Sequence, residues 1–339
     1  MRRLPLIKPS RRSLLSSAGL IAAGLALPRR VHSAQPAKLT LAILFVPRGD
    51  FAPYYLARER GYYAQAGIDL TIKHVLGNAF AFQMLSAGNA EFAHADIVQM
   101  LQLQGLTPEP AMKSVAVVCG RIPLSLFYLN GRGIEKPRDL AGRSIVDSPG
   151  STTPALIKLL AQANGFDAGT IEWKSAAANA KAALMLQGQA DAVSTYLPAL
   201  PSTAARAPAG KTVGVFNFGD HGVDIYGDGI ISTSAFVRAN PDLTKAFVQA
   251  TLRGYTDAFA NPAAAVEAIV KSAPELDRAN ALKELDIARI LNKKSDRDFA
   301  GFGAHDPVKM AATYAAVTGA IRQPIARPVG DFFTNDFLA

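Results

Sequence analysis

A strand–helix–strand–helix–strand pattern occurs twice in this 339-residue chain, and no other feature restricts its fold as strongly. The strands of both copies are short apolar or β-branched runs, predicted at 39–46, 68–75, 91–95, 144–146, 171–176 and 191–195. Helical patterns join the strands within each copy. Such alternation predicts two α/β lobes, each with a parallel sheet and right-handed crossovers.

The two copies also end alike. LSAGNAE at 85–91 matches MLQGQAD at 185–191, which lies 100 positions later, and each segment closes a helix at a glycine before the next strand. An echo this short arises by chance in α/β proteins, but the same element order surrounds it in both copies. Two similar lobes are therefore the favoured interpretation.

After residue 220 the chain changes character. An extended run is expected at 222–236, followed by helices that begin at Asn240-Pro241 and Asn261-Pro262. In both pairs Asn suits the N-cap and Pro the first helical turn. We expect these later helices to pack on the first lobe.

The N-terminus resembles an export signal. Residues 1–34 combine basic residues with an apolar run from Leu14 to Leu27 and small residues at Ser33 and Ala34. The segment SRRSLL at 10–15 resembles the twin-arginine motif, which prefers Phe where Leu14 stands. A membrane-spanning helix is disfavoured, since the apolar run is shorter than the roughly 20 residues that a bilayer core needs. A periplasmic location is expected.

Charge and cysteine content exclude several functions. The formal net charge is +9, but seven of the 36 basic residues lie in the predicted signal, which leaves 29 against 27 acidic residues, a formal net charge of about +2. Nucleic-acid binding and binding to anionic membranes are therefore not expected. The single cysteine, Cys119, excludes an intramolecular disulfide.

Ligands of α/β sheets bind at the carboxyl ends of the strands. If the two lobes face each other, the loops at those ends line one cleft. The predicted ligand-binding residues follow these strand ends or lie beside the expected crossings between the lobes: Arg48, Asp50, Phe51, Tyr54, Asn78, Asp96, Arg121, Ser148, Ser151, Thr152, Thr153, Tyr196, Asp224 and Tyr226.

Two of these groups have alternative interpretations. The turn at 148–153 begins a helix, so its N–H groups favour an electronegative ligand, although an ordinary Ser/Thr cap has the same composition. Arg48 and Asp50 either orient a ligand or pair with each other. Phe51 and Tyr54 would supply an aromatic wall, although a helical Tyr is often half buried in the core.

Catalytic and metal-binding motifs are missing from the sequence. The five histidines have no metal-ligand spacing, and neither the hydrolase pattern GxSxG nor a phosphate-binding loop ending in Gly-Lys-Ser/Thr is present. No metal, no cofactor and no enzymatic activity are therefore expected.

The segment FAPYYLARERGYYAQAGIDLTI (51–72) closely resembles periplasmic solute-binding proteins of ABC transporters, in the nitrate, alkanesulfonate, taurine and thiamine-pyrimidine class. Further matching segments follow in order along the chain: LSAGNAEFAHADI, KPRDLAGRSIVDSPGST, LQGQADAVSTYLPA, YGDGIISTSAFVRANPDLTKAFVQATLRGY and FFTNDFL. The resemblance spans nearly the whole chain after the signal, but it rests mostly on segments of the scaffold.

This resemblance implies a type II periplasmic-binding-protein fold, in which two lobes joined by a two-strand hinge close on a ligand. The first lobe would comprise 35–120 and 225–339, and the second 121–224. The resemblance also implies a monomer that delivers its ligand to an ABC permease with its ATPase. Alternatives are a sensory binding module and an enzyme like the eukaryotic pyrimidine synthases. Those synthases carry a Cys-rich motif, whereas this chain has one cysteine.

Members of that class bind small oxyanions or flat polar heterocycles. Arg48, Arg121 and the turn at 148–153 predict a small organic anion, a sulfonate or carboxylate with a possible aromatic part. A thiamine-precursor pyrimidine or related heterocycle is the alternative ligand. It is disfavoured, since the pyrimidine binders often carry Glu shortly after the counterpart of DAVSTYLP and the stretch 196–202 has no acid.

Replacing Arg11 and Arg12 by Lys is expected to retain the precursor in the cytoplasm, because Lys keeps the charge but lacks the planar guanidinium group. Fractionation of cells that express the full chain measures this. Lys at Arg29 and Arg30, outside the motif, is the matched control. An unchanged periplasmic amount of the first variant would contradict twin-arginine export.

Overall fold

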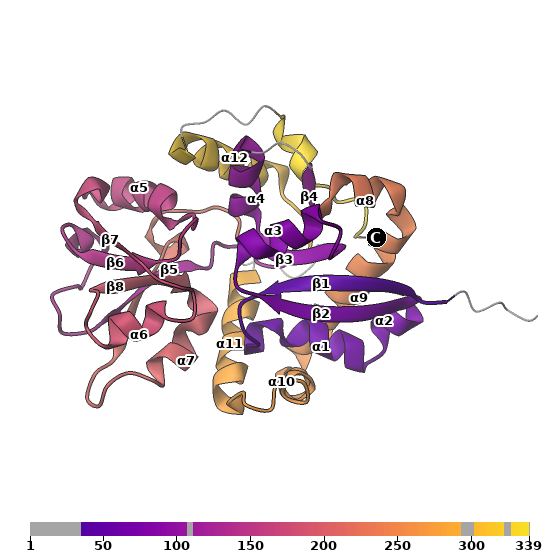
Figure 1. Cartoon of the computed structure of the whole chain (residues 1–339), viewed down its shortest axis with the longest axis horizontal. Coiled ribbons are helices and arrows are strands. Elements are labelled where there is room, and N and C mark those ends of the chain that lie inside the picture. The colour runs from indigo at the N-terminus through magenta and orange to yellow at the C-terminus, as the bar shows by residue number, and fades with distance from the viewer. Residues whose placement is uncertain (1–34, 107–110, 293–301, 322–326, 339) are drawn as a thin grey trace, which may run out of the picture. The chain divides into compact units, whose positions relative to one another are not determined.

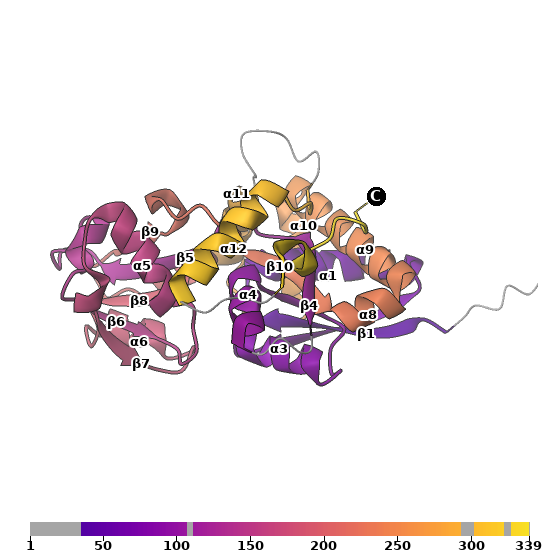
Figure 2. The same ribbon diagram turned by 90° about the horizontal axis from the view of Figure 1, so that it is seen from above.

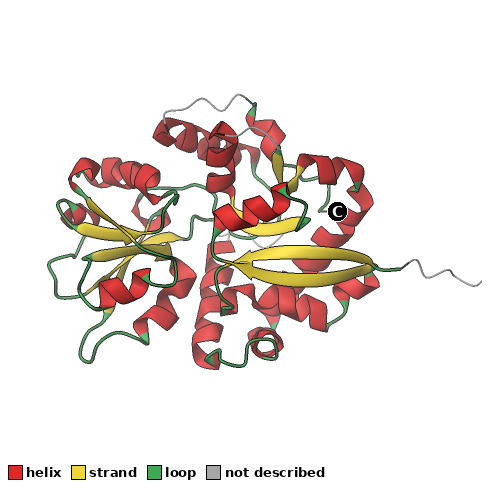
Figure 3. Ribbon diagram, in the orientation of Figure 1, coloured by secondary structure: helices red, strands yellow, loops and turns green. Residues whose placement is uncertain are grey.

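Two five-stranded sheets organise the chain, each with helices on both sides (Figures 1 and 3). The computed structural model describes residues 35–106, 111–292, 302–321 and 327–338, and the predicted signal at 1–34 lies outside these ranges. Pro36–Ala339 forms one compact unit. Within the described residues, no helix is long and apolar enough to span a bilayer.

The first sheet has the strand order β2-β1-β3-β10-β4. Its strands are β1 (Ala37–Leu44), β2 (Ile68–Val75), β3 (Phe92–Asp96), β4 (Met112–Val117) and β10 (Asp228–Thr233). Neighbouring helices are α1 (Ala52–Glu59), α2 (Tyr62–Gln65), α3 (Asn78–Ser86) and α4 (Ile97–Leu106). The strands β1, β3, β4 and β10 are largely buried, as expected for a sheet covered on both faces, whereas the edge strand β2 is partly exposed.

The second sheet has the order β7-β6-β8-β5-β9. Its strands are β5 (Leu124–Leu129), β6 (Ser144–Asp147), β7 (Glu172–Ser175), β8 (Ala192–Tyr196) and β9 (Val213–Asn217). Its helices are α5 (Thr153–Asn164), α6 (Lys181–Leu186) and α7 (Leu200–Ala204), and short 3₁₀ turns occur at η2 (Pro137–Leu140), η3 (Ala168–Thr170), η4 (Leu197–Ala199) and η5 (Gly219–His221).

The prediction of purely parallel sheets is wrong. Each βαβαβ unit is parallel, but β10 pairs antiparallel with β3 and β4, and β5 pairs antiparallel with β8 and β9. The reason is the path of the chain, since β5 and β10 enter their sheets from the other lobe and not through a crossover helix. The extended run expected at 222–236 is correspondingly shorter, because α8 (Ser234–Ala239) begins directly after β10.

The sequence echo has a structural counterpart. In the first lobe Glu91 accepts a hydrogen bond from the Thr40 N–H at 2.6 Å, and its own N–H donates to the Thr40 carbonyl. In the second lobe Asp191 makes the same pair of contacts with Ser144, at 2.9 Å from its carboxylate to the Ser144 N–H. The acid after each glycine turn therefore ties its segment to the first strand of its own unit.

Two crossing segments connect the lobes, one between β4 and β5 and one between β9 and β10. They touch each other, since the Gly227 N–H donates to the Cys119 carbonyl at 3.1 Å. A Cβ on Gly227 would lie 2.6 Å from Pro123 Cδ, so only glycine permits this approach. The lobe limits 35–120 with 225–339, and 121–224, remain a prediction from sequence.

The later helices are α9 (Pro241–Ala260), α10 (Pro262–Val270), α11 (Arg278–Asn292) and α12 (Pro307–Ile321), with η6 (Val329–Phe332) near the C-terminus. Asn261 caps α10 by accepting from the Ala264 N–H, whereas the Asn240 side chain makes no such bond. α9 and α10 pack on α1, as expected, but α11 also contacts α7 and α12 also contacts α5 (Figures 1 and 2). The expected packing on the first lobe is therefore present, with α11 on α10 and α12 on α4, and α11 and α12 add contacts with the second lobe.

Gly254→Ala is expected to lower the free energy of unfolding by about 1–3 kcal/mol, the usual cost of overpacking. Gly254 lies where α9 crosses α1, and a Cβ there would be 2.5 Å from the Ala57 Cβ. The matched control is Gly319→Ala in α12, which has open space around it and should gain about 0.5–1 kcal/mol from helix propensity. Chemical denaturation measures both, and stabilisation by both variants would contradict the tight helix crossing.

Candidate functional site

One pocket lies at the carboxyl ends of β1 and β3 and beside the two crossing segments. Its walls are mostly aromatic and apolar. The rings come from Phe45, Phe51, Tyr196 and Tyr255, and Pro123 and Pro198 add apolar surface. Most of the lining comes from the first sheet and its helices, and Pro123, Tyr196 and Pro198 come from the chain segment of the second sheet.

Phe45 directly follows β1 and has a left-handed backbone with φ of +61°. A bulky residue rarely adopts this conformation, and such strain occurs preferentially at functional positions. The ring centroid of Phe45 lies 5.7 Å from that of Tyr196. His74 also contacts Phe45, with its Nδ1 at 3.1 Å from the Phe45 carbonyl oxygen, which helps to hold the residue in place.

Arg48 and Asp50 form a bidentate ion pair in the pocket wall. Arg48 donates from Nε and Nη2 to the two carboxylate oxygens of Asp50, at 2.9 and 2.7 Å. Burial alone would lower the pKa of Arg48, but the Asp50 carboxylate outweighs it and raises that pKa. Glu284 of α11 accepts from the neighbouring Gly49 N–H at 2.8 Å and so anchors this turn. Much of the positive charge of Arg48 is therefore already neutralised.

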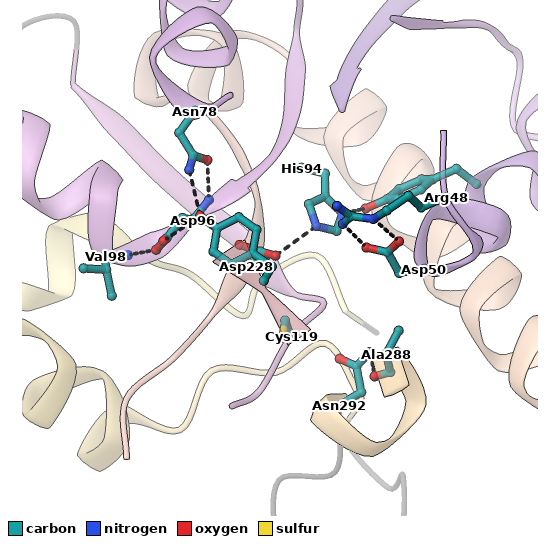
Figure 4. A network of polar contacts seen from close by, with 12 residues as sticks. Arg48, Asp50, Asn78, His94, Asp96, Val98, Cys119, Asp228, Ala288 and Asn292 are labelled. Carbon is teal, nitrogen blue, oxygen red and sulfur yellow. Dashed lines mark hydrogen bonds and ion pairs between the residues drawn. The ribbon is translucent and has the colours of Figure 1, made fainter. Parts of the chain in front are cut away.

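A second polar chain runs from α1 through β3 to β10. Tyr54 Oη lies 2.9 Å from His94 Nδ1, and His94 Nε2 lies 3.3 Å from Asp228 Oδ2 (Figure 4). Because a carboxylate only accepts, we assign the ring proton to Nε2 and the Tyr54 proton to the bond with Nδ1. The other oxygen of Asp228, Oδ1, is buried and has no hydrogen-bond partner among the residues that the structure describes.

A third group joins the lobes. Tyr196 donates to Asp96 Oδ2 at 3.3 Å and accepts from Asn78 Nδ2 at 3.2 Å. Asp96 also accepts from the Val98 N–H at 2.7 Å (Figure 4). Burial, followed by the Asp228 carboxylate, raises the pKa of Asp96 to about 7. Asp96 and Asp228 are direct neighbours across β3 and β10, so their two acidic groups share one buried region.

The structure distributes the predicted site residues over several places. Arg48, Asp50, Phe51 and Tyr196 line the pocket. Asn78 and Asp96 bind Tyr196 behind it, and Tyr54 is fully buried behind His94. The remaining predicted residues do not line this pocket: Arg121, Ser148, Ser151, Thr152, Thr153, Asp224 and Tyr226.

Several of these outlying residues have partners of their own. Arg121 Nη2 donates to Asp220 at 2.6 Å, and Lys309 donates to Asp224 at 2.5 Å. Tyr226 Oη accepts from the Asp306 N–H at 2.7 Å. The polar groups of these three predicted residues therefore bind other residues of the protein.

The turn at 148–153 is occupied by a carboxylate of the chain itself. Asp147 accepts from the Ser148 N–H at 2.7 Å and from Ser151 Oγ, and Lys181 donates to it at 2.8 Å. Thr153 Oγ1 lies 2.6 Å from Ser194 Oγ. Asp147 therefore takes up the Ser148 N–H and the Ser151 hydroxyl, whereas Ser148 Oγ is buried without a hydrogen-bond partner among the described residues, and a ligand site at this turn stays a prediction.

The sequence reasoning missed several lining residues: Phe45, His94, Val118, Cys119, Pro123, Pro198, Asp228, Tyr255, Ala288 and Leu291. The strand-end rule would have found Phe45 if the first strand had ended two residues earlier. Asp228 lies in the YGDG stretch, which the family resemblance had already marked. Ala288 and Leu291 of α11 have no sequence signal, because their position depends on how a distant helix packs.

The chain matches known proteins both in sequence and in fold. A family model described as "NMT1/THI5 like" matches residues 48–265, which is more than half of the chain and includes most of the pocket. The chain belongs to the NMT1/THI5-like family. The resemblance to solute-binding proteins stated from sequence is confirmed at the level of family and fold.

Relatives of this NMT1/THI5-like protein include two binding proteins. The riboflavin-binding protein RibY of Chloroflexus aurantiacus is 28% identical over 72% of this chain and 69% of its own length. The formylaminopyrimidine-binding protein of Halalkalibacterium halodurans is 26% identical over 74% and 76%. The alkanesulfonate-binding protein SsuA of Xanthomonas axonopodis pv. citri has a TM-score of 0.67 at 14% identity, covering 87% of this chain and 96% of SsuA. That likeness confirms the predicted periplasmic-binding-protein fold.

Asp96→Asn is expected to reduce the pH dependence of stability. The folded-state pKa of about 7 lies above the ordinary value of 3.8, so ionisation of Asp96 costs stability as pH rises from about 4 to 7. The free energy of unfolding of the variant, relative to that of the wild type, should therefore be higher at pH 8 than at pH 5. The expected difference is on the order of a few kcal/mol. Denaturation curves at both pH values measure this. Asp69→Asn, at an exposed position of β2, is the control, and an unchanged pH slope for Asp96→Asn would contradict the raised pKa.

Proposed function

We propose that this protein is the substrate-binding component of an ABC import system and that it captures a flat nitrogen heterocycle of the pyrimidine or flavin kind. It acts in the periplasm and delivers its ligand to a permease and ATPase in the inner membrane. It does so by binding alone, without catalysis. The proposal for the ligand departs from the organic anion expected from sequence.

The composition of the pocket is the observation that carries this proposal. Four aromatic rings stand around one guanidinium and two carboxylates, those of Asp50 and Asp228. Ring faces favour a flat ligand, because stacking is available to any π system. The polar groups favour a ligand with hydrogen-bond donors and acceptors on its edge. The names of the two relatives, a riboflavin binder and a formylaminopyrimidine binder, agree with this chemistry.

An anionic ligand is supported less well. Arg48 is the cation of the pocket and already pairs with Asp50, while Asp228 adds an unneutralised carboxylate. A sulfonate or carboxylate would meet a guanidinium whose charge Asp50 already neutralises, and it would lie near Asp228. Bringing like charges together in a buried site is unfavourable. The fold of SsuA does not alter this, because the polar groups and not the scaffold determine the ligand.

The lobes also support a capture mechanism. Tyr196 belongs to β8 of the second sheet, but its ring lies against Phe45 and its hydroxyl binds Asp96 and Asn78 of the first lobe. Opening the cleft would break these contacts and expose the pocket. Closure about the two crossing segments would then enclose a ligand in the pocket that Tyr196 and Phe45 line, in the manner of hinge-bending binding proteins.

Thermal-shift and calorimetric titration of the ligand-free protein test this proposal. A ligand that binds only the folded state raises the melting temperature. We expect a saturable rise with riboflavin, lumiflavin or formylaminopyrimidine and none with taurine, alkanesulfonates, nitrate or aliphatic carboxylates. A rise with sulfonates that Arg48→Ala abolishes would instead establish the anion expected from sequence.

Phe45→Ala is expected to weaken heterocycle binding by roughly 1–3 kcal/mol, the range for loss of a ring that stacks on a base. With a flavin, the quenching of its fluorescence on binding should also decrease. The matched control is Phe80→Ala on α3, whose side chain is 53% exposed and does not line the pocket. Equal affinities for wild type and Phe45→Ala would remove Phe45 from the ligand site.

A further inference from the structure

Asp228 differs from the other acidic groups near the pocket, because one of its oxygens has no partner. Oδ2 is bound by His94, whereas Oδ1 is buried without a hydrogen-bond partner among the described residues. The residue is 8% exposed and lines the pocket. By contrast, both carboxylate oxygens of Asp50 are held by Arg48.

An unpartnered carboxylate oxygen in a buried site is costly, because it has lost water without gaining a donor. Such a cost is unusual in a folded protein, where most buried polar atoms are paired. A ligand that brings an N–H group to this oxygen recovers the lost bond. A ligand with a carbonyl or ring nitrogen lone pair there would instead meet a repulsive acceptor.

The surroundings restrict how Asp228 can respond. Its backbone is held in β10 between β3 and β4, and its carbonyl accepts from the N–H groups of Val118 and Cys119, at 3.0 and 2.9 Å. His94 is itself held by Tyr54 at 2.9 Å. The backbone of Asp228 and one of its carboxylate oxygens are therefore held in place.

Resting on the function proposed above, we propose that Asp228 selects ligands whose ring edge carries an N–H donor, such as a lactam, an imide or an exocyclic amine. Oδ1 accepts the ligand N–H while His94 keeps Oδ2. Arg48 serves the complementary edge, since its Nη1 has no hydrogen-bond partner within the described residues and the residue lines the same pocket. The pocket would thus recognise a ligand whose ring edge carries a donor next to an acceptor, as a lactam or an imide does.

Matched pairs of ligands test the role of Asp228 without any change to the protein. The probes are lumiflavin with 3-methyllumiflavin, and 4-amino-2-methylpyrimidine with its 4-dimethylamino derivative. Methylation removes the N–H and leaves the ring intact. For the wild type, calorimetry should show about 10- to 100-fold weaker binding of the methylated member, the loss expected for one hydrogen bond to a charged group.

Asp228→Asn separates loss of the hydrogen bond from the bulk of the methyl group. His94 Nε2–H will hold the Asn oxygen, so the amide NH₂ takes the place of Oδ1 and turns an acceptor into a donor. The ratio of affinities within each pair should then fall to about threefold or less. Asp220→Asn is the matched control, because Asp220 is exposed and pairs with Arg121 away from the pocket.

The outcomes are distinct. Equal binding of both members of each pair by the wild type would overturn the role of Asp228 and leave the proposed function standing. So would an unchanged ratio in Asp228→Asn, since the methyl group would then act by its size alone. If neither parent heterocycle bound the wild type, the proposed function would fail and this inference with it.

Discussion

Strand β10 returns from the second lobe and inserts antiparallel between β3 and β4, and the candidate site depends on this insertion. It places Asp228 opposite Asp96, beside His94 and above the crossing segment at Cys119. It also joins β4 to the rest of the first sheet, although β10 begins 111 positions after β4 ends. The acidic centre of the pocket is therefore made by strand pairing between distant parts of the chain.

Two opposing electrostatic arrangements follow from that geometry. The positive charge of Arg48 is neutralised by its ion pair with Asp50. Glu284 holds the turn between them by accepting a hydrogen bond from the Gly49 N–H. Around Asp96 and Asp228, negative charge accumulates, and burial raises the pKa of Asp96 to about 7. The site as a whole combines apolar walls with a few polar groups and has no excess of positive charge. Such an environment favours a neutral ring with donors and acceptors over a free anion.

Tyr196 connects binding to the movement of the lobes. Its ring forms part of the pocket wall, and its hydroxyl bridges Asp96 and Asn78 across the cleft. Burial, with the neighbouring Asp96, raises the pKa of Tyr196 well above its ordinary value, so the hydroxyl stays protonated and remains a donor. The same side chain thus contacts both the pocket and the opposite lobe, so that in the proposed capture mechanism closure of the lobes would also enclose the ligand.

The sequence by itself determined the elements of both α/β units, the echo that Glu91 and Asp191 carry, and the strand ends where Arg48, Asp50, Phe51 and Tyr196 lie. These follow from local hydrophobic period, glycine turns and the strand-end rule, all of which act over a few residues. Only the tertiary structure decided that Asp147 binds Ser148 and Ser151, that Arg48 is neutralised, and that Asp228 and α11 enter the site. Those outcomes depend on antiparallel pairing and helix packing between segments far apart in sequence, which no local pattern encodes.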